Sequence, residues 1–143
     1  MSCLILDLHP GDALIINGAS LRFRNRAMVE LTAHARFLVG KQIMPPAQAT
    51  SPARRIYFAL QAAYIGSDEE RDRGLAQARE LTSAFKAATT SALACRILDR
   101  AIVLAEADQG YRALKLARRI MLHEDKVLAA AERRPAPTGP APH

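Results

Sequence analysis

Apolar and polar residues alternate along the first forty residues of the chain, and this spacing predicts short β-strands. Leu4, Leu6 and Leu8 fall on one strand face, because successive side chains of a strand point to opposite sides. The pair Asn17-Gly18 is a strong hairpin signal. We therefore expect a small antiparallel meander here, with a weaker pattern in its last part.

Beyond residue 45 the apolar positions recur with the period of an α-helix. The first expected helix runs from about Pro52 to Ile65 and is apolar nearly all round. Three more are expected, one after Ser67, one after Ser91 and one from Tyr111 to about Glu132. The pattern predicts an α+β fold, in which a small N-terminal antiparallel β-sheet precedes a C-terminal array of about four helices.

A chain of 143 residues suits one domain, or two small subdomains that share a core. We place a β subdomain at 1–44 and a helical subdomain at 45–132. The remaining 133–143 are rich in proline and cannot build a core, so we expect a disordered tail.

The charge of the chain favours an anionic partner. Its formal net charge is +6 and its sequence pI is near 9.9, which puts nucleic acid first among candidate partners. The alternative is a protein with a basic surface and no such role.

The last predicted helix carries a basic stripe. Its members are spaced three, four, four and three residues apart, and they are Arg112, Lys115, Arg119, His123 and Lys126. Leu114, Ala117, Met121 and Leu128 lie opposite and are expected to face the core. Such a stripe can follow the phosphates of a nucleic acid. The alternative is a solvated face whose charge is softened by Glu124 and Asp125.

Two further groups of arginines are candidates for the same partner. Arg22, Arg24 and Arg26 share one face if their strand continues through Asn25, and the triplet shrinks to a pair if the chain turns there. The alternative to phosphate binding is an edge strand that these charges protect against pairing with other chains. Arg54 and Arg55 fall in the first turn of the Pro52 helix, where free amide groups also attract anions. Their alternative role is an ion pair with an acidic residue of the strands, such as Glu30 or Asp12.

Tyr57 and Tyr64 are seven residues apart and so lie on one helical face. They could line a groove for a partner helix, or pack in the core or an interface.

Nothing in the sequence predicts an enzyme. The four histidines are scattered, no metal-ligand spacing appears, and there is no phosphate-binding glycine loop. We expect no catalytic residue, metal or cofactor. The two distant cysteines indicate reduced thiols in a cytoplasmic protein, and we expect neither a signal peptide nor a membrane span.

Three motifs in order carry a family resemblance. They are Leu8-His9-Pro10-Gly11-Asp12 with Ile15-Ile16-Asn17-Gly18-Ala19, then Thr50-Ser51-Pro52-Ala53-Arg54-Arg55-Ile56-Tyr57-Phe58-Ala59-Leu60-Gln61, and then Tyr111-Arg112-Ala113-Leu114-Lys115-Leu116-Ala117-Arg118-Arg119 followed by Glu124. Over about residues 1–130 the chain resembles the FlbT family of flagellum-biosynthesis regulators. Asp12 stands where the family often has Glu, which is a mild departure.

The resemblance implies a cytoplasmic post-transcriptional regulator. Members of the family associate with the 5′ untranslated region of flagellin mRNA and promote its degradation, although in some bacteria the effect on flagellin is positive. They act with a small companion, FlaF, and are linked to flagellin. The family implies no catalytic residues.

The expected RNA contacts are Arg22, Arg24, Arg54, Arg55, Arg112, Lys115 and Arg119. Since no aromatic pattern for stacking unpaired bases is present, association through a protein partner stays open. The rival hypothesis is an adaptor that presents Tyr57, Tyr64 or neighbouring apolar groups to flagellin or FlaF.

Overall fold

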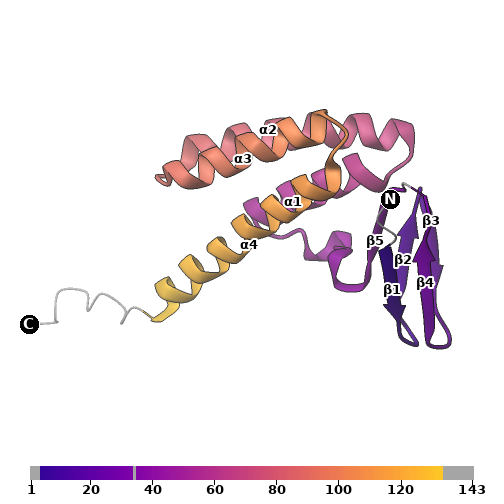
Figure 1. Cartoon of the computed structure of the whole chain (residues 1–143). Helices are drawn as coiled ribbons and strands as arrows, with labels where there is room; N and C mark the ends of the chain where they lie inside the picture. The colour runs from indigo at the N-terminus through magenta and orange to yellow at the C-terminus, as the bar shows by residue number, and fades with distance from the viewer. Residues whose placement is uncertain (1–3, 34, 134–143) are drawn as a thin grey trace, which may run out of the picture.

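Within the residues that the structure describes, five short strands make up the N-terminal part of the protein. The computed structural model describes residues 4–33 and 35–133. The strands are β1 (Leu4–Leu8), β2 (Ala13–Ile16), β3 (Ala19–Arg22), β4 (Ala27–Leu31) and β5 (Phe37–Val39). They form two antiparallel sheets, one of β1 and β4 and one in the order β3-β2-β5 (Figure 1). The predicted antiparallel strands are therefore confirmed.

The predicted meander is wrong, because β1 does not pair with β2. Leu4 lies opposite Leu31 and Leu8 opposite Ala27, so β1 pairs directly with β4. Along the chain, these two strands enclose the β2–β3 hairpin. Nested hairpins and a meander share the same period-two alternation, which fixes the face of each side chain but not the partner strand. The turn at Asn17-Gly18 is confirmed, and both residues have the positive φ that such a turn requires.

In the described part of the chain, four helices follow two short 3₁₀ turns, Gly40–Gln42 and Pro46–Gln48. The helices are α1 (Pro52–Ile65), α2 (Asp68–Ala88), α3 (Ala92–Glu106) and α4 (Gly110–Arg133). Ser51, Ser67 and Ser91 each accept a hydrogen bond from a backbone amide in the first turn of the helix that follows. These side chains are N-caps, and they explain where α1, α2 and α3 begin.

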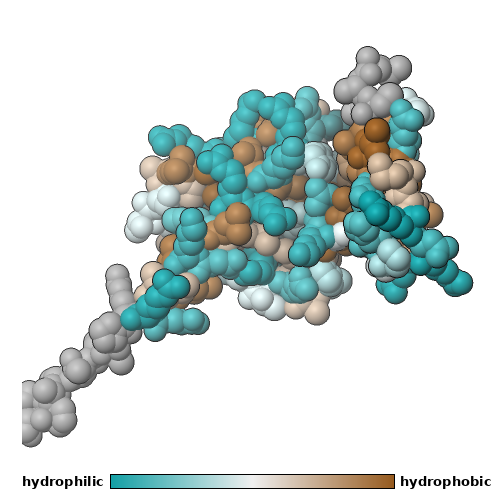
Figure 2. All heavy atoms as spheres, turned by 60° about the horizontal axis from the view of Figure 1, so that its bottom comes forward, coloured by the Kyte–Doolittle hydropathy of each residue, from teal (hydrophilic) through white to brown (hydrophobic). Residues whose placement is uncertain are grey.

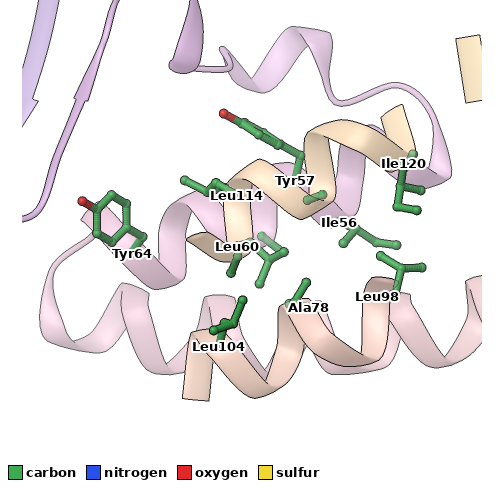
Figure 3. Packing of buried hydrophobic residues seen from close by; sticks show 14 of the residues in the cluster. Ile56, Tyr57, Leu60, Tyr64, Ala78, Leu98, Leu104, Leu114 and Ile120 are labelled. Carbon is green, nitrogen blue, oxygen red and sulfur yellow. The ribbon is translucent and has the colours of Figure 1, made fainter. Parts of the chain in front are cut away.

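Helix α1 lies at the centre of the core and contacts α2, α3 and α4 (Figure 3). Ile56 and Leu60 of α1 are each 1% exposed and pack in one cluster with Leu98 of α3. Leu38 of β5 and Met44 of the connector belong to the same cluster. The strand and helix regions therefore share a core.

Helix α1 also holds the connector by polar contacts. The buried side chain of Gln61 donates to the Met44 carbonyl at 3.0 Å and accepts from the Met44 amide at 2.7 Å. Both backbone groups of Met44 are thereby satisfied, as a buried segment without regular structure requires. This contact explains the single strongly polar residue on the apolar part of α1.

Helix α4 continues beyond the body of the protein (Figures 1 and 2). Its buried residues end at Ile120. Leu128, which was predicted to face the core, is 52% exposed, so that prediction is wrong. Among the described residues, none of the helices combines the length and the hydropathy that a membrane span needs. Of the predicted tail, only Arg133 lies within the described residues, as the last residue of α4.

Candidate nucleic-acid interface

One face of α4 carries a row of exposed cations. At about 100° per residue, six of its basic side chains fall within an arc of about 120°. All six are exposed, and none forms an ion pair with another described residue. They are Arg112, Lys115, Arg118, Arg119, Lys126 and Arg133, and we call them the basic face of α4.

The basic face is long enough to meet several phosphates. At a rise of about 1.5 Å per residue, Arg112 and Arg133 are about 30 Å apart along the helix axis. His123 lies at the edge of the face and is also exposed. Near its start, the Lys115 ammonium lies 4.8 Å from the centre of the Tyr111 ring, a cation–π contact that restrains this lysine. The predicted stripe is therefore present as a solvent-facing surface.

The two carboxylates that were expected to soften this face are engaged elsewhere. Glu124 accepts hydrogen bonds from the Ser51 hydroxyl and, at 3.0 Å, from the Ala53 amide. An oxygen of Asp125 lies 2.9 Å from the Arg54 guanidinium. Both acidic side chains are turned toward α1, so they leave the basic face with little compensating charge.

The anion-binding position predicted at the start of α1 exists, and carboxylates of the same chain occupy it. Arg54 lies 3.7 Å from Glu124 in addition to its contact with Asp125. The predicted pairing of an arginine here is thus confirmed for Arg54, but its partners belong to α4 and not to the strands. Arg55 is exposed and has no ion pair among the described residues.

The strand arginines form a separate basic spot. Strand β3 ends at Arg22, and the chain bends through Arg24 and Asn25, so the face of three that a continuous strand would give is absent. Arg26 donates two hydrogen bonds to Asp7, at 3.2 and 3.1 Å, and these lower the pKa of the Asp7 carboxyl. Arg22 and Arg24 remain exposed.

This spot and the helices lie at opposite ends of the β2–β3 hairpin. Arg22 pairs with Ala13 at the open end, whereas the turn at Gly18 approaches Ile65 at the end of α1. The structure brings Arg112, Lys115 and Arg119 onto one surface, but it does not join Arg22 and Arg24 to them.

Tyr57 and Tyr64 belong to the core, as the alternative to a partner groove predicted (Figure 3). They are 5% and 8% exposed. The Tyr57 hydroxyl donates to the Gln42 carbonyl at 2.6 Å, and the Tyr64 hydroxyl accepts from the Phe37 amide at 3.0 Å. Burial raises the pKa of both phenols. A partner would find neither ring accessible.

Sequence reasoning missed three residues that belong to the basic face or support it. Arg118 and Arg133 lie on it, and their spacing from Lys115 and Lys126 could have revealed them. Tyr111 supports it, because its ring stacks on Phe37 with centres 5.5 Å apart. Among residues 4–33 and 35–133, no cluster of His, Cys, Asp or Glu is suited to hold a metal ion.

These features define an α+β protein in which one helix, α4, carries an exposed cationic face. The family described as "Flagellar protein FlbT" matches residues 4–128, and the chain belongs to this family.

Curated relatives cover most of the chain. A protein of Agrobacterium fabrum named "Probable flagellum biosynthesis repressor protein FlbT" is 29% identical over 142 residues, 94% of this chain and 90% of the relative. "Probable flagellum biosynthesis repressor protein FlbT 2" of Bradyrhizobium diazoefficiens is 31% identical over 128 residues, 87% of this chain and 90% of the relative. No solved structure matches the chain.

Proposed function

We propose that this protein is a cytoplasmic regulator of flagellum biosynthesis that acts after transcription. It associates with the 5′ untranslated region of flagellin mRNA and promotes degradation of that transcript. The names of the relatives support the flagellar role. The observation that carries the RNA contact is the basic face of α4, whose cations are exposed while the acidic neighbours Glu124 and Asp125 are occupied by α1.

A row of cations binds a polyanion chiefly by releasing its counterions, so affinity falls steeply with salt. Arg112, Lys115 and Arg119 are the central contacts of the proposal, and Arg118 extends them. Arg22, Arg24 and Arg55 are exposed and can add contacts outside this face. Arg54 leaves the proposed set, because Glu124 and Asp125 already hold its guanidinium.

Phosphate contacts position a protein on RNA but carry no sequence information directly. The basic face has a single ring at its start, Tyr111, and Phe37 and Lys115 already occupy its surroundings. Selection of the transcript and its degradation therefore require a second component. We propose FlaF or flagellin as that component, and a separate nuclease for the cleavage itself.

The substitution Arg119→Glu tests the RNA contact. We expect weaker binding to a flagellin leader RNA and a salt slope that flattens by about 0.7–0.9 for each phosphate that the variant no longer neutralises. Arg73→Glu on α2 is the matched control, because Arg73 is also exposed, forms no ion pair with a described residue and lies off the basic face. Equal affinities and slopes for the two folded variants would refute direct binding by α4.

The second candidate function is a protein adaptor that reaches the mRNA indirectly. Tyr57 and Tyr64 are too buried to serve it, but an apolar groove on α1 and α2 favours it. Binding of purified protein to the leader RNA, with and without FlaF across a salt series, separates the two functions. RNA binding that appears only with FlaF supports the adaptor.

A further inference from the structure

We propose that a groove between the start of α1 and the end of α2 binds an amphipathic helix of a partner protein, and that this helix carries acidic residues beside its apolar stripe. The groove has a volume of about 380 Å³. Its lining consists of Pro52, Arg55, Leu81, Ala84, Phe85, Ala88 and Thr89. This site lies apart from the basic face of α4, and its role does not depend on RNA binding.

The wall formed by α2 has the spacing of a helix-packing seam. Leu81, Ala84, Phe85 and Ala88 occur at i, i+3, i+4 and i+7, so they lie along one side of the helix. They extend over about 10 Å, or two helical turns. Ala84 and Ala88 are exposed and small, which lets a neighbouring backbone approach closely. An apolar strip of this kind is what helix-in-groove recognition uses.

The charge at the groove selects an acidic occupant. Arg55 is the one charged residue of the lining, it is exposed, and no described carboxylate pairs with it. Its neighbour Arg54 is different, because Glu124 and Asp125 neutralise it. Glu124 already opposes the positive end of the α1 dipole, so Arg55 is the charge of this groove that remains for a partner. A partner carboxylate beside the apolar stripe would complement this guanidinium.

Two other occupants fit less well. In a symmetric dimer the same patch of each copy meets, and each patch would bring a cation and no carboxylate. RNA would offer its phosphates to Arg55, but the remaining lining holds one aromatic ring, Phe85, and mainly aliphatic groups. A helix that carries both apolar and acidic side chains satisfies the whole surface.

Two synthetic helical peptides test this proposal with the full chain. One has Leu at i, i+4 and i+7 with Glu on the flank, and the other has Lys in place of each Glu. We expect fluorescence anisotropy to show binding of the acidic peptide and at least about tenfold weaker binding of the basic peptide. Arg55→Glu should reverse this preference, and Arg73→Glu, on an exposed cation away from the groove, should leave it unchanged.

A second variant tests the apolar part of the groove. Ala84→Glu should abolish binding of both peptides, whereas Ala76→Glu, at an exposed alanine of the same helix outside the lining, should not. Failure of the acidic peptide to bind, or binding that neither Arg55→Glu nor Ala84→Glu alters, overturns the proposal. The proposal is also overturned if light scattering shows self-association that Ala84→Glu removes. The same holds if Ala84→Glu lowers RNA affinity as much as Arg119→Glu does.

Discussion

Glu124, beyond the last buried turn of α4, accepts a hydrogen bond of 3.0 Å from the backbone amide of Ala53 in the first turn of α1. The same carboxylate accepts from the Ser51 hydroxyl, which itself caps α1. A carboxylate at a helix start satisfies free amides and opposes the partial positive charge there. This contact fixes the middle of α4 against α1 and leaves its basic face outward.

Replacing Glu124 with Gln should therefore destabilise the protein. The side chain is 13% exposed, and its charge serves the Ala53 amide and Arg54 together. We expect a loss of about 1–2 kcal/mol, typical of removing a helix cap or a charged hydrogen bond, measured by urea unfolding. Hydrogen exchange should also rise over residues 121–133. Glu132→Gln, at an exposed position of the same helix, should change neither property; equal effects would contradict the assigned role.

Local patterns in the sequence predicted the start of α1 at about Pro52 and the cations of α4 as one stripe, because both depend on neighbours within a few residues. They did not predict the partner of Ser51 and Arg54, since Glu124 is 73 residues from Ser51 along the chain. The spacing of Leu128 indicated a core position for the same local reason. Whether another element reaches that far along α4 is a tertiary property, and among the described residues none covers it.

The strands show the same division between local and long-range information. Alternation placed Leu4 and Leu8 on one strand face, of which Leu8 is buried and Leu4 exposed, and the Asn17-Gly18 turn was predicted from two residues. The pairing of Leu8 with Ala27 depends on how two hairpins nest, which alternation does not encode. For the same reason the sequence left open whether Arg26 would extend a basic face, and in the structure it is bound to Asp7.

The Arg26–Asp7 pair predicts a titration effect that can be measured directly. Hydrogen bonding to Arg26 lowers the pKa of the Asp7 carboxyl, so Arg26→Gln should raise that pKa toward the ordinary value of about 3.9. A lowered pKa stabilises the folded state at pH values above the ordinary pKa of the carboxyl. This stabilisation is lost as the pH falls through the pKa of the folded protein. NMR titration of the Asp7 side chain measures the shift. Arg24→Gln should leave it unchanged.

Tyr57 predicts a change at the alkaline end of the pH range. Burial raises the pKa of its phenol, so the folded protein keeps the proton while the unfolded chain loses it near a pH of about 10. The stabilisation is therefore complete below the unfolded value and is lost as the pH rises through the folded value.

Tyr57→Phe separates this proton effect from the hydrogen bond to Gln42. At neutral pH the variant should be less stable by about 1–2 kcal/mol, because the Gln42 carbonyl loses its donor. Between pH 9 and pH 11, about one unit on either side of the reference phenol pKa, the free energy of unfolding should fall less in the variant than in the parent protein. Urea unfolding at each pH measures this difference. Parallel pH profiles would show that Tyr57 does not titrate as proposed.

Gly74 sets two physical effects against each other. Alanine normally favours a helix over glycine by about 1 kcal/mol, which alone would make Gly74→Ala stabilising. At this position, however, a Cβ atom would lie 2.7 Å from the Ala63 amide nitrogen and 2.8 Å from the Ala59 carbonyl oxygen, both in the backbone of α1. Backbone atoms cannot rotate away, so the α1–α2 contact must open.

We expect the overpacking cost of about 1–3 kcal/mol to exceed the helical gain, with a net loss of stability in urea or thermal unfolding. Ala76→Gly, at an exposed position of α2, measures the propensity term alone. A Gly74→Ala variant more stable than the parent would mean that the two helices can separate at little cost.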